Sequence, residues 1–184
     1  EAPISTDLVD GQIWNWIDFD NDGDLDAYLT NYKGTSVSGY PNEMYRNDGA
    51  GFVKLTSSDV GPIVTDAGIS LSSNWGDFDN DGDLDCIVTN ESQQKNCYYQ
   101  SNVRQGSTVF TKISTEPFTL NNGDHWSACN GDYDNDGDLD LFISASSDKG
   151  LFLNTTTQHD FINIKLVGSS SNKSAIGAKV RIKA

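Results

Sequence analysis

The chain has 184 residues, enough for one domain of ordinary size, and its formal net charge of −15 at pH 7 makes it strongly acidic. This charge excludes a nucleic-acid binder that works through a basic face, and it disfavours docking on anionic membranes. The sequence has no run of about 18 apolar residues and no apolar leader segment, so we expect neither a signal peptide nor membrane insertion.

The acidic residues are concentrated in three short segments. Of the 27 Asp and Glu residues, fifteen are Asp in three clusters of five. An acidic balance this strong indicates either disorder or cation binding. Charge that is focused in short segments favours cation binding, because like charges held close together need a counter-ion.

These clusters belong to an internal repeat of eleven residues. The copies read WIDFDNDGDLD at 16–26, WGDFDNDGDLD at 75–85 and NGDYDNDGDLD at 130–140. Corresponding residues are 59 and 55 positions apart, a period typical of blades, solenoids and arrays.

Short runs around each acidic segment are typical of strands, since they are rich in β-branched and aromatic residues. The first repeat predicts strands at 13–16, 27–30, 43–46 and 51–55. The second predicts them at 70–73, 86–89, 97–100 and 109–113, and the third at 125–128, 141–144 and 150–153. Four short strands per repeat indicate a propeller blade. No stretch of 12 or more residues has a helical apolar period, so we expect an all-β protein.

The chain changes character near residue 155. A polar stretch at 155–158 is followed by an alternating β pattern at 161–168, a Ser/Asn-rich turn and a last expected strand at 178–182. We therefore divide the chain into three blades at 1–154 and a C-terminal β segment at 155–184.

The acidic segment has the ligand pattern of a calcium loop. Counted from Asp18, positions 1, 3, 5 and 9 carry carboxylates, Gly23 at position 6 permits a sharp turn, and Asp24 at position 7 can offer its backbone carbonyl. Hard oxygen ligands on a flexible loop suit Ca²⁺, whereas Mg²⁺ prefers fewer carboxylates and Zn²⁺ prefers His or Cys. The predicted metal ligands are Asp18, Asp20, Asp22, Asp24, Asp26, Asp77, Asp79, Asp81, Asp83, Asp85, Asp132, Asp134, Asp136, Asp138 and Asp140.

Two other interpretations of these loops are weaker. An EF-hand needs a bidentate Glu at position 12 and flanking helices, whereas position 12 here is Leu29, Val88 or Ile143 in an expected strand. A metal-free hairpin turn is common for Asp, Asn and Gly. However, five Asp in nine residues would repel one another strongly without a cation. We therefore expect three Ca²⁺ ions, one per loop.

The motif D-x-D-x-D-G-D-x-D followed by a strand resembles the FG-GAP/VCBS repeat family, the blade unit of integrin-α-like propellers. The resemblance covers about residues 8–154. It implies Ca²⁺ ligands on the side chains at positions 1, 3, 5 and 9 and on the carbonyl at position 7. Segments 161–168 and 171–180 resemble the start of the ASPIC/UnbV segment that follows such repeats. Because that family's segment continues further, the chain resembles part of a longer protein.

No catalytic constellation emerges, so we expect no enzyme. A glycosidase-like carboxylate pair is disfavoured because the clustered Asp residues are committed to loops. His125 and His159 have no partnered motif, and neither a G-x-S-x-G nor an H-E-x-x-H motif occurs.

Trp and Cys residues leave two smaller questions. Trp14, Trp16 and Trp75 come shortly before acidic loops, which favours blade packing over a sugar-stacking platform, as does the position of Trp126. Cys86 and Cys97 lie on adjacent expected strands. The pair either forms a cross-strand disulfide or remains as two free thiols, and the sequence allows both.

The expected function is a non-catalytic, calcium-stabilised extracellular module for adhesion or assembly, with a subunit of a surface polymer or filament as one form. Extracellular modules often bind Ca²⁺ at about 10⁻⁴–10⁻³ M, which favours a secreted location. The alternative is a carbohydrate-binding or accessory module of a larger secreted enzyme. The expected partner is therefore a protein or a glycan. Three blades form only a partial propeller, since closed ones use about 4–8.

Overall fold

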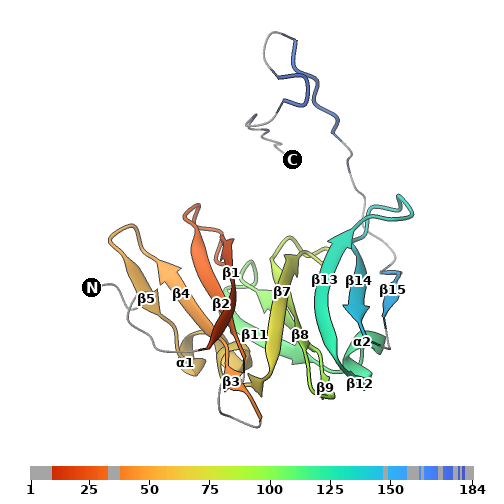
Figure 1. The fold of residues 1–184 in the computed structure, drawn as a ribbon. Helices are drawn as coiled ribbons and strands as arrows, with labels where there is room; N and C mark the ends of the chain where they lie inside the picture. Colours follow the sequence, from red (N-terminus) through yellow and green to blue (C-terminus); the bar gives the residue numbers. More distant parts are fainter. Residues whose placement is uncertain are drawn as a thin grey trace.

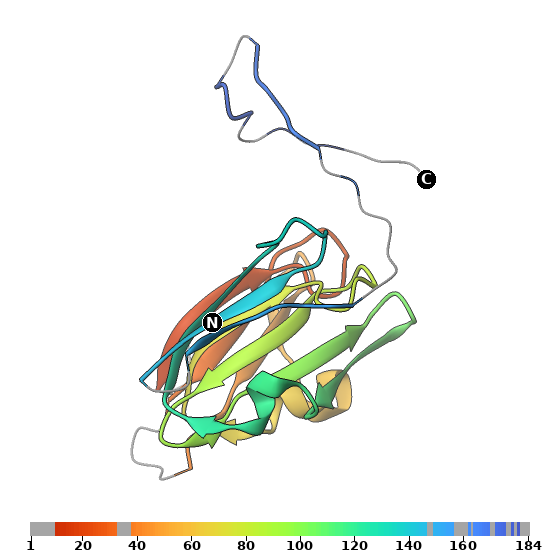
Figure 2. The ribbon, with the colours of Figure 1, turned by 90° about the vertical axis from the view of Figure 1, so that its right-hand side faces the viewer.

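Three antiparallel β-sheets stand side by side in the order in which they occur along the chain (Figure 1). The computed structural model describes residues 10–32, 38–146, 149–156, 162, 164–169, 172–175, 178 and 180. After a quarter turn, the sheets lie one behind another with their strands inclined in the same direction (Figure 2). We number the sheets one to three along the chain.

The first sheet has four strands in the order β1-β2-β4-β5. They are β1 (Gly11–Ile17), β2 (Asp26–Asn31), β4 (Glu43–Asn47) and β5 (Phe52–Lys54). All six residues of β2 are buried. Successive side chains of a strand point to opposite faces. Tyr28 and its cross-strand partner Met44 therefore face the second sheet, whereas Ala27 and its partner Tyr45 face away from it.

The second sheet repeats this arrangement and the third repeats three strands of it. The second sheet consists of β7 (Ser70–Gly76), β8 (Asp85–Asn90), β10 (Cys97–Asn102) and β11 (Ser107–Ile113), in the order β11-β10-β8-β7. The third consists of β13 (His125–Gly131), β14 (Asp140–Ala145) and β15 (Gly150–Phe152). Within the described residues, no fourth strand follows β15 in the third sheet.

Small elements connect consecutive sheets. The two-residue strands β3 (Tyr40–Pro41) and β6 (Ala67–Gly68) pair with each other, and so do β9 (Gln94–Lys95) and β12 (Asn122–Gly123). The connections also contain three short helices, α1 (Ser57–Val60), η2 (Gly61–Val64) and α2 (Pro117–Leu120). None of these helices, each of four residues, is long and apolar enough to cross a membrane.

The hydrophobic core is divided into two layers, one in each space between neighbouring sheets. The layer between sheets one and two contains Phe19, Tyr28 and Met44 from the first sheet and its loop, with Cys86, Tyr99 and Phe110 from the second. The layer between sheets two and three is built from Phe78, Ile87, Tyr98, Leu141 and Ile143. Apolar burial therefore joins each sheet to the next one along the chain.

The predicted fold class is confirmed, because the protein is nearly all β and its sheets are blade-like units that form no closed propeller. Every strand predicted within the three repeats is present, with bounds that differ by a few residues. The sequence missed α1, η2 and α2, because one turn of helix leaves no periodic pattern.

The C-terminal segment gives a different result. Of the expected strands, Phe161, Asn163, Lys179, Arg181 and Ile182 lie outside the described residues. The described residues 162, 164–168, 178 and 180 are in no strand, so the predicted strands are not formed there. The domain boundary near residue 155 stays a prediction.

Candidate metal centre

Each acidic loop joins the first two strands of its sheet. The loops leave β1, β7 and β13 at Asp18, Asp77 and Asp132 and re-enter the sheet at the first residue of β2, β8 and β14. Since both flanking strands are paired with each other, the two ends of the loop are held close together. The strands thus fix the position of the acidic side chains.

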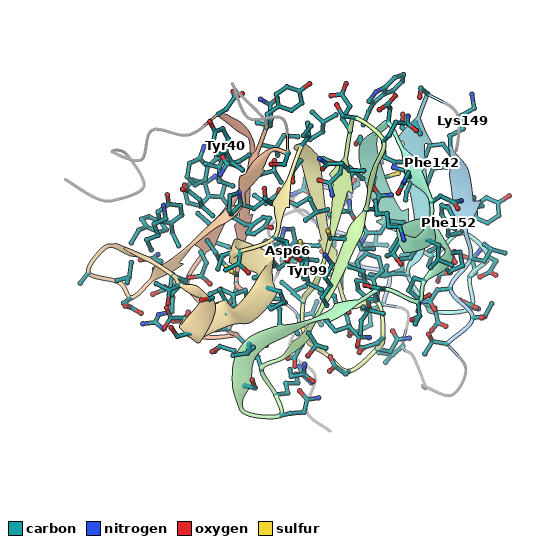
Figure 3. All side chains as sticks on the ribbon, turned by 90° about the horizontal axis from the view of Figure 1, so that it is seen from below. Tyr40, Asp66, Tyr99, Phe142, Lys149 and Phe152 are labelled. Carbon is teal, nitrogen blue, oxygen red and sulfur yellow. The ribbon has the colours of Figure 1, made fainter. Side chains whose placement is uncertain are left out.

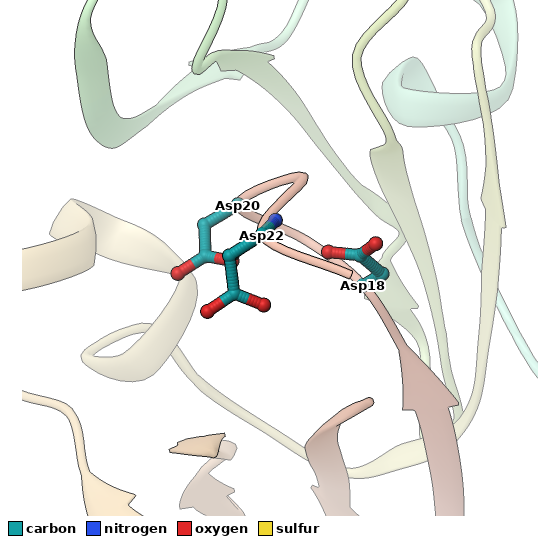
Figure 4. Close-up of side chains that lie close together, drawn as sticks. All are labelled: Asp18, Asp20 and Asp22. Carbon is teal, nitrogen blue, oxygen red and sulfur yellow. The ribbon is translucent and has the colours of Figure 1, made fainter. Parts of the chain in front are cut away.

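Three carboxylates converge in every loop. In the first loop, Asp18, Asp20 and Asp22 each place an oxygen within 4.8 Å of the other two (Figure 4). The same positions converge in the other loops. The three converging groups are Asp18, Asp20 and Asp22; Asp77, Asp79 and Asp81; and Asp132, Asp134 and Asp136. These nine residues can hold metal ions.

Backbone amides hold the carboxylates of the first loop in place. The N–H of Gly23 donates to Asp18 Oδ2 at 3.1 Å, and the N–H of Asp24 donates to Asp22 Oδ1 at 2.9 Å. The chain bends tightly because Asn21 and Gly23 have positive φ values of 59° and 96°. Asn and Gly are the residues that tolerate this conformation best. Corresponding residues have the same conformation in the other two loops.

The converging carboxylates oppose one another's ionisation. Desolvation and the neighbouring Asp22 carboxylate raise the pKa of Asp20. Desolvation and Asp81 raise the pKa of Asp79 in the same way, and desolvation and Asp136 raise that of Asp134. A nearby cation favours the ionised form and lowers such pKa values.

A cation fits these groups for a second reason. The Oδ1 atoms of Asp18 and Asp77 are buried and have no hydrogen-bond partner among the described residues. A buried carboxylate oxygen without a partner is costly. In both loops the orphaned oxygen belongs to position 1 of a converging group, where a hard cation would satisfy it.

The carboxylates at position 9 are placed differently from the converging groups. Asp26 accepts hydrogen bonds from the N–H of Phe19 at 3.2 Å and of Asn47 at 2.8 Å. Asp85 and Asp140 each accept the corresponding two bonds. Burial raises the pKa of Asp26 to about 6 and that of Asp85 to about 7. Asp26 and Asp85 thus connect the loop to the third strand of their sheet, and Asp140 connects it to Asn154 just after the third strand, a role that the sequence did not predict.

In the second and third loops, the side chain at position 7 contacts the preceding acidic loop. Asp83 accepts a hydrogen bond at 3.2 Å from the side chain of Asn21, which is position 4 of the first loop. Asp138 accepts the corresponding bond at 2.7 Å from Asn80 of the second loop. The sequence missed this role because an Asn between two Asp residues has the composition of any turn. The signal that reveals it is the threefold recurrence of Asn at position 4.

The remaining candidates of the sequence lie outside the acidic loops, and His159 lies outside the described residues. Trp75 packs edge-on against Tyr28 between the first two sheets, as blade packing requires. Trp126 is exposed. Cys86, Cys97 and Cys129 are free thiols.

A comparison with protein families agrees with this architecture. The FG-GAP-like repeat matches twice, at residues 18–88 and 77–143, and each match runs from one acidic loop into the first strand after the next loop. No curated protein matches the chain. Repeats of this family are typical of extracellular proteins. Neither match reaches the C-terminal segment, so its resemblance to ASPIC/UnbV stays a prediction. The two matches together cover residues 18–143, more than half of the 184, and the chain belongs to the FG-GAP-like repeat family.

Proposed function

We propose that the protein is a non-catalytic, extracellular adhesion or assembly module whose sheets are stabilised by three Ca²⁺ ions, one in each acidic loop. The carboxylates at positions 1, 3 and 5 provide the first ligands. The carbonyl at position 7 and the carboxylate at position 9 are the remaining expected ligands.

One observation carries the proposal. Three carboxylates converge in each of three loops, and two of these loops bury a carboxylate oxygen that no described residue satisfies. Ca²⁺ accepts six to eight oxygen ligands in flexible geometry, whereas Mg²⁺ demands a near-ideal octahedron and keeps several waters. An all-carboxylate loop closed by backbone turns therefore favours Ca²⁺.

Calorimetric titration of the metal-free chain with Ca²⁺ tests the proposal. We expect three ions per chain and an unfolding temperature that rises with Ca²⁺ concentration, because an ion that binds only the folded state stabilises that state. The variant D79N removes one ligand charge from the second loop and should leave two ions.

The matched control is D48N. Asp48 is exposed, lies outside the loops and pairs with Arg46 at 2.6 Å. This substitution changes the net charge by the same amount as D79N and should leave three bound ions. Unchanged melting with Ca²⁺, together with no measurable heat of binding, would refute the calcium proposal.

A glycan-binding module is the second candidate, and one observation favours it. Trp14 and Trp16 stack on the first sheet with ring centroids 6.4 Å apart and an interplanar angle of 17°, and both are partly exposed. Sugar rings pack on such aromatic surfaces. A glycan array probed with the protein and with W16A tests this candidate, which requires a specific signal that the variant loses.

A further inference from the structure

Sheets one and two each end in a fourth strand with the same sequence pattern. Strand β5 and the residue after it read FVKL at 52–55, and the corresponding part of β11 reads FTKI at 110–113. The register is also the same, because each lysine lies opposite the tyrosine of the third strand, Tyr45 or Tyr99. The fourth strand is therefore a repeated part of the sheet with the pattern Phe-x-Lys-aliphatic.

The phenylalanine of β11 fills part of the junction between sheets one and two, the space that holds one layer of the core. Phe110 is 1% exposed, and its ring centroid lies 6.3 Å from that of Phe19 and 6.0 Å from that of Trp75. Phe19 stands at position 2 of the first acidic loop, so the Phe110 ring contacts the preceding sheet. The fourth strand of sheet two thus completes both its own sheet and this junction.

No described strand completes the junction between sheets two and three in this way. A groove of about 540 Å³ opens there, and its walls include Phe78 and Tyr98 of sheet two, Phe118 of α2 and Phe152 of sheet three. The ring centroid of Phe118 lies 5.9 Å from that of Tyr98 and 5.7 Å from that of Phe152. Figure 3 shows Phe152 on the third sheet, at the end of the row of sheets. Aromatic side chains of both sheets therefore line this groove.

The groove corresponds to the place that Phe110 occupies in the first junction. Phe78 is position 2 of the second loop, as Phe19, the neighbour of Phe110, is of the first. Phe152 stands where Tyr99 stands in sheet two, because each lies opposite the residue that follows position 9 of its loop. The counterparts of both neighbouring residues line the groove, so it is the space that the phenylalanine of a fourth strand would fill.

The backbone edge beside the groove has no paired strand within the part of the chain that the structure describes. β15 pairs with β14 along one side, and no described strand pairs with its other side. In sheet two, the same side of β10 pairs with β11 over residues 98–100, which correspond to 151–153. The N–H and C=O groups of such an edge can pair with another strand. Groove and edge together therefore form a site for an extended segment.

The lysine of the repeated pattern indicates which charge the segment should carry. In sheet one, Lys54 Nζ lies 5.7 Å from the ring centroid of Tyr45 and 2.6 Å from Glu43 Oε1. Lys112 in sheet two likewise lies over the ring of its tyrosine and pairs with a carboxylate. A lysine two residues after the phenylalanine is thus held by a ring and an acid in both complete sheets.

The groove has the matching features. Phe152 offers a ring at the place of the two tyrosines, and Glu116 and Asp79 are among the residues that line the groove. None of its described lining residues is Lys, Arg or His. The chain as a whole carries a formal charge of −15. This site therefore attracts a basic segment and repels an acidic one.

We propose that β15 and this groove bind an extended segment of a partner protein by strand addition, and that the segment carries the pattern Phe-x-Lys-aliphatic. The added strand runs antiparallel to β15, places its phenylalanine beside Phe78 and holds its lysine over the ring of Phe152. Main-chain hydrogen bonds supply affinity, and the groove for the phenylalanine supplies specificity. The proposal rests on the adhesion function proposed above and names the chemistry of the partner.

A synthetic peptide with the sequence of residues 107–114, STVFTKIS, tests the proposal, because it carries the pattern on a free segment. Fluorescence anisotropy of the labelled peptide at saturating Ca²⁺ should show one peptide bound per 184-residue chain. The F110A form of the peptide should bind about 10-fold more weakly. The K112E form should bind about 5-fold more weakly. Hydrogen exchange of the chain should slow at residues 151–153 when the peptide is bound, because strand addition protects the amides of β15.

One substitution in the chain tests the charge of the groove. E116K reverses the Glu116 charge and should weaken binding of the unsubstituted peptide about 5-fold. The Glu116 side chain makes no capping hydrogen bond to α2, so the fold should tolerate this change. The matched control is D48K, which changes the net charge equally at an exposed residue outside the groove and should leave peptide binding unchanged.

Three results would overturn the proposal. One is the absence of saturable binding at about 1 mM peptide. Another is equal affinity for the peptide and its F110A form. The third is slow exchange of all amides at 151–153 in the free chain, which would show that β15 is already paired with the chain itself or with a second copy.

The calcium proposal and this one fail separately in the same titrations. Three bound ions on a chain that binds no peptide would contradict the strand-addition site alone. A chain that binds the peptide at β15 but binds no Ca²⁺ would contradict the ion sites alone.

Discussion

The second and third acidic loops share the sequence DNDGDLD, at 79–85 and 134–140, but differ in their surroundings. The converging carboxylates of the second loop are half-buried, whereas those of the third are exposed. Strand β10 and the turn that follows it cover the second loop, since Gln100 of β10 donates to Asp79 at 3.1 Å and Gln105 of the turn donates to Asp81 at 3.0 Å. No strand follows β15 among the described residues. The environment of a loop is therefore set by the strands that come after it, not by its own sequence.

Alanine at position 9 should produce the largest difference in stability between the second and third loops. D85A leaves two buried N–H groups, of Phe78 and Ser101, without their acceptor. We expect a loss of about 4 kcal/mol in the free energy of unfolding. D140A should cost about 2 kcal/mol, because water can replace the lost acceptor at the exposed edge of sheet three. Urea unfolding measures both, and equal losses would contradict the difference in cover.

Alanine at position 2 compares the aromatic residues of the second and third loops. F78A removes a buried ring from the junction of sheets two and three and should cost about 3 kcal/mol. Y133A removes an exposed ring and should change stability by less than about 0.5 kcal/mol. Urea unfolding measures both values. A large effect of Y133A would mean that this ring is covered in the folded protein.

The cover of the second loop should also raise its affinity for Ca²⁺. Partners of metal ligands orient them, and their loss typically weakens binding by about 10-fold or more. Q105A should therefore weaken one of three sites about 10-fold and leave the other two unchanged. Q93A is the control, because Gln93 donates to Asp124, outside the loops. Calorimetric titration distinguishes the two variants. Equal isotherms would show that the hydrogen bond from Gln105 does not affect the affinity of the second loop for Ca²⁺.

The smallest effect is expected from pH in the presence of chelator. Burial raises the pKa of Asp85 to about 7, above the unfolded value of about 3.9. This group therefore favours the folded state fully below about pH 3.9, and that contribution is lost as the pH rises through about 7. Acidification from pH 8 to 5 should raise the unfolding temperature of the metal-free chain, and D85N should flatten that rise. A fall in the unfolding temperature of the unsubstituted chain on acidification, unchanged by D85N, would contradict this prediction.

Much of this architecture can be predicted from the sequence, because local patterns determine it. Strands such as Asp85–Asn90 are short apolar runs next to a recognisable loop, and the period of the loops locates them. The convergence of Asp77, Asp79 and Asp81 follows from their spacing around Gly82, whose φ is 90°. Local spacing is enough wherever the contacts lie within one turn of the chain.

Contacts between distant repeats could not be predicted in the same way. The bond from Asn21 to Asp83 spans 62 residues, and neither residue type reveals its partner. The two backbone bonds of Asp85 were missed because a carboxylate suits a metal and an N–H group equally well. In the C-terminal segment, alternation at 161–168 predicted a strand, but alternation alone does not supply a neighbouring strand with which to pair.

The ribbons β3–β6 and β9–β12 give the row of sheets an asymmetric mechanical construction. They join consecutive sheets at the end opposite the acidic loops, with two residues per strand (Figure 1). Under a stretching force we expect neighbouring sheets to separate first at the end that carries the acidic loops, where one side-chain hydrogen bond joins each pair of loops. The ribbons would act as hinges that keep the sheets in order, so that the row can close again when the tension is released.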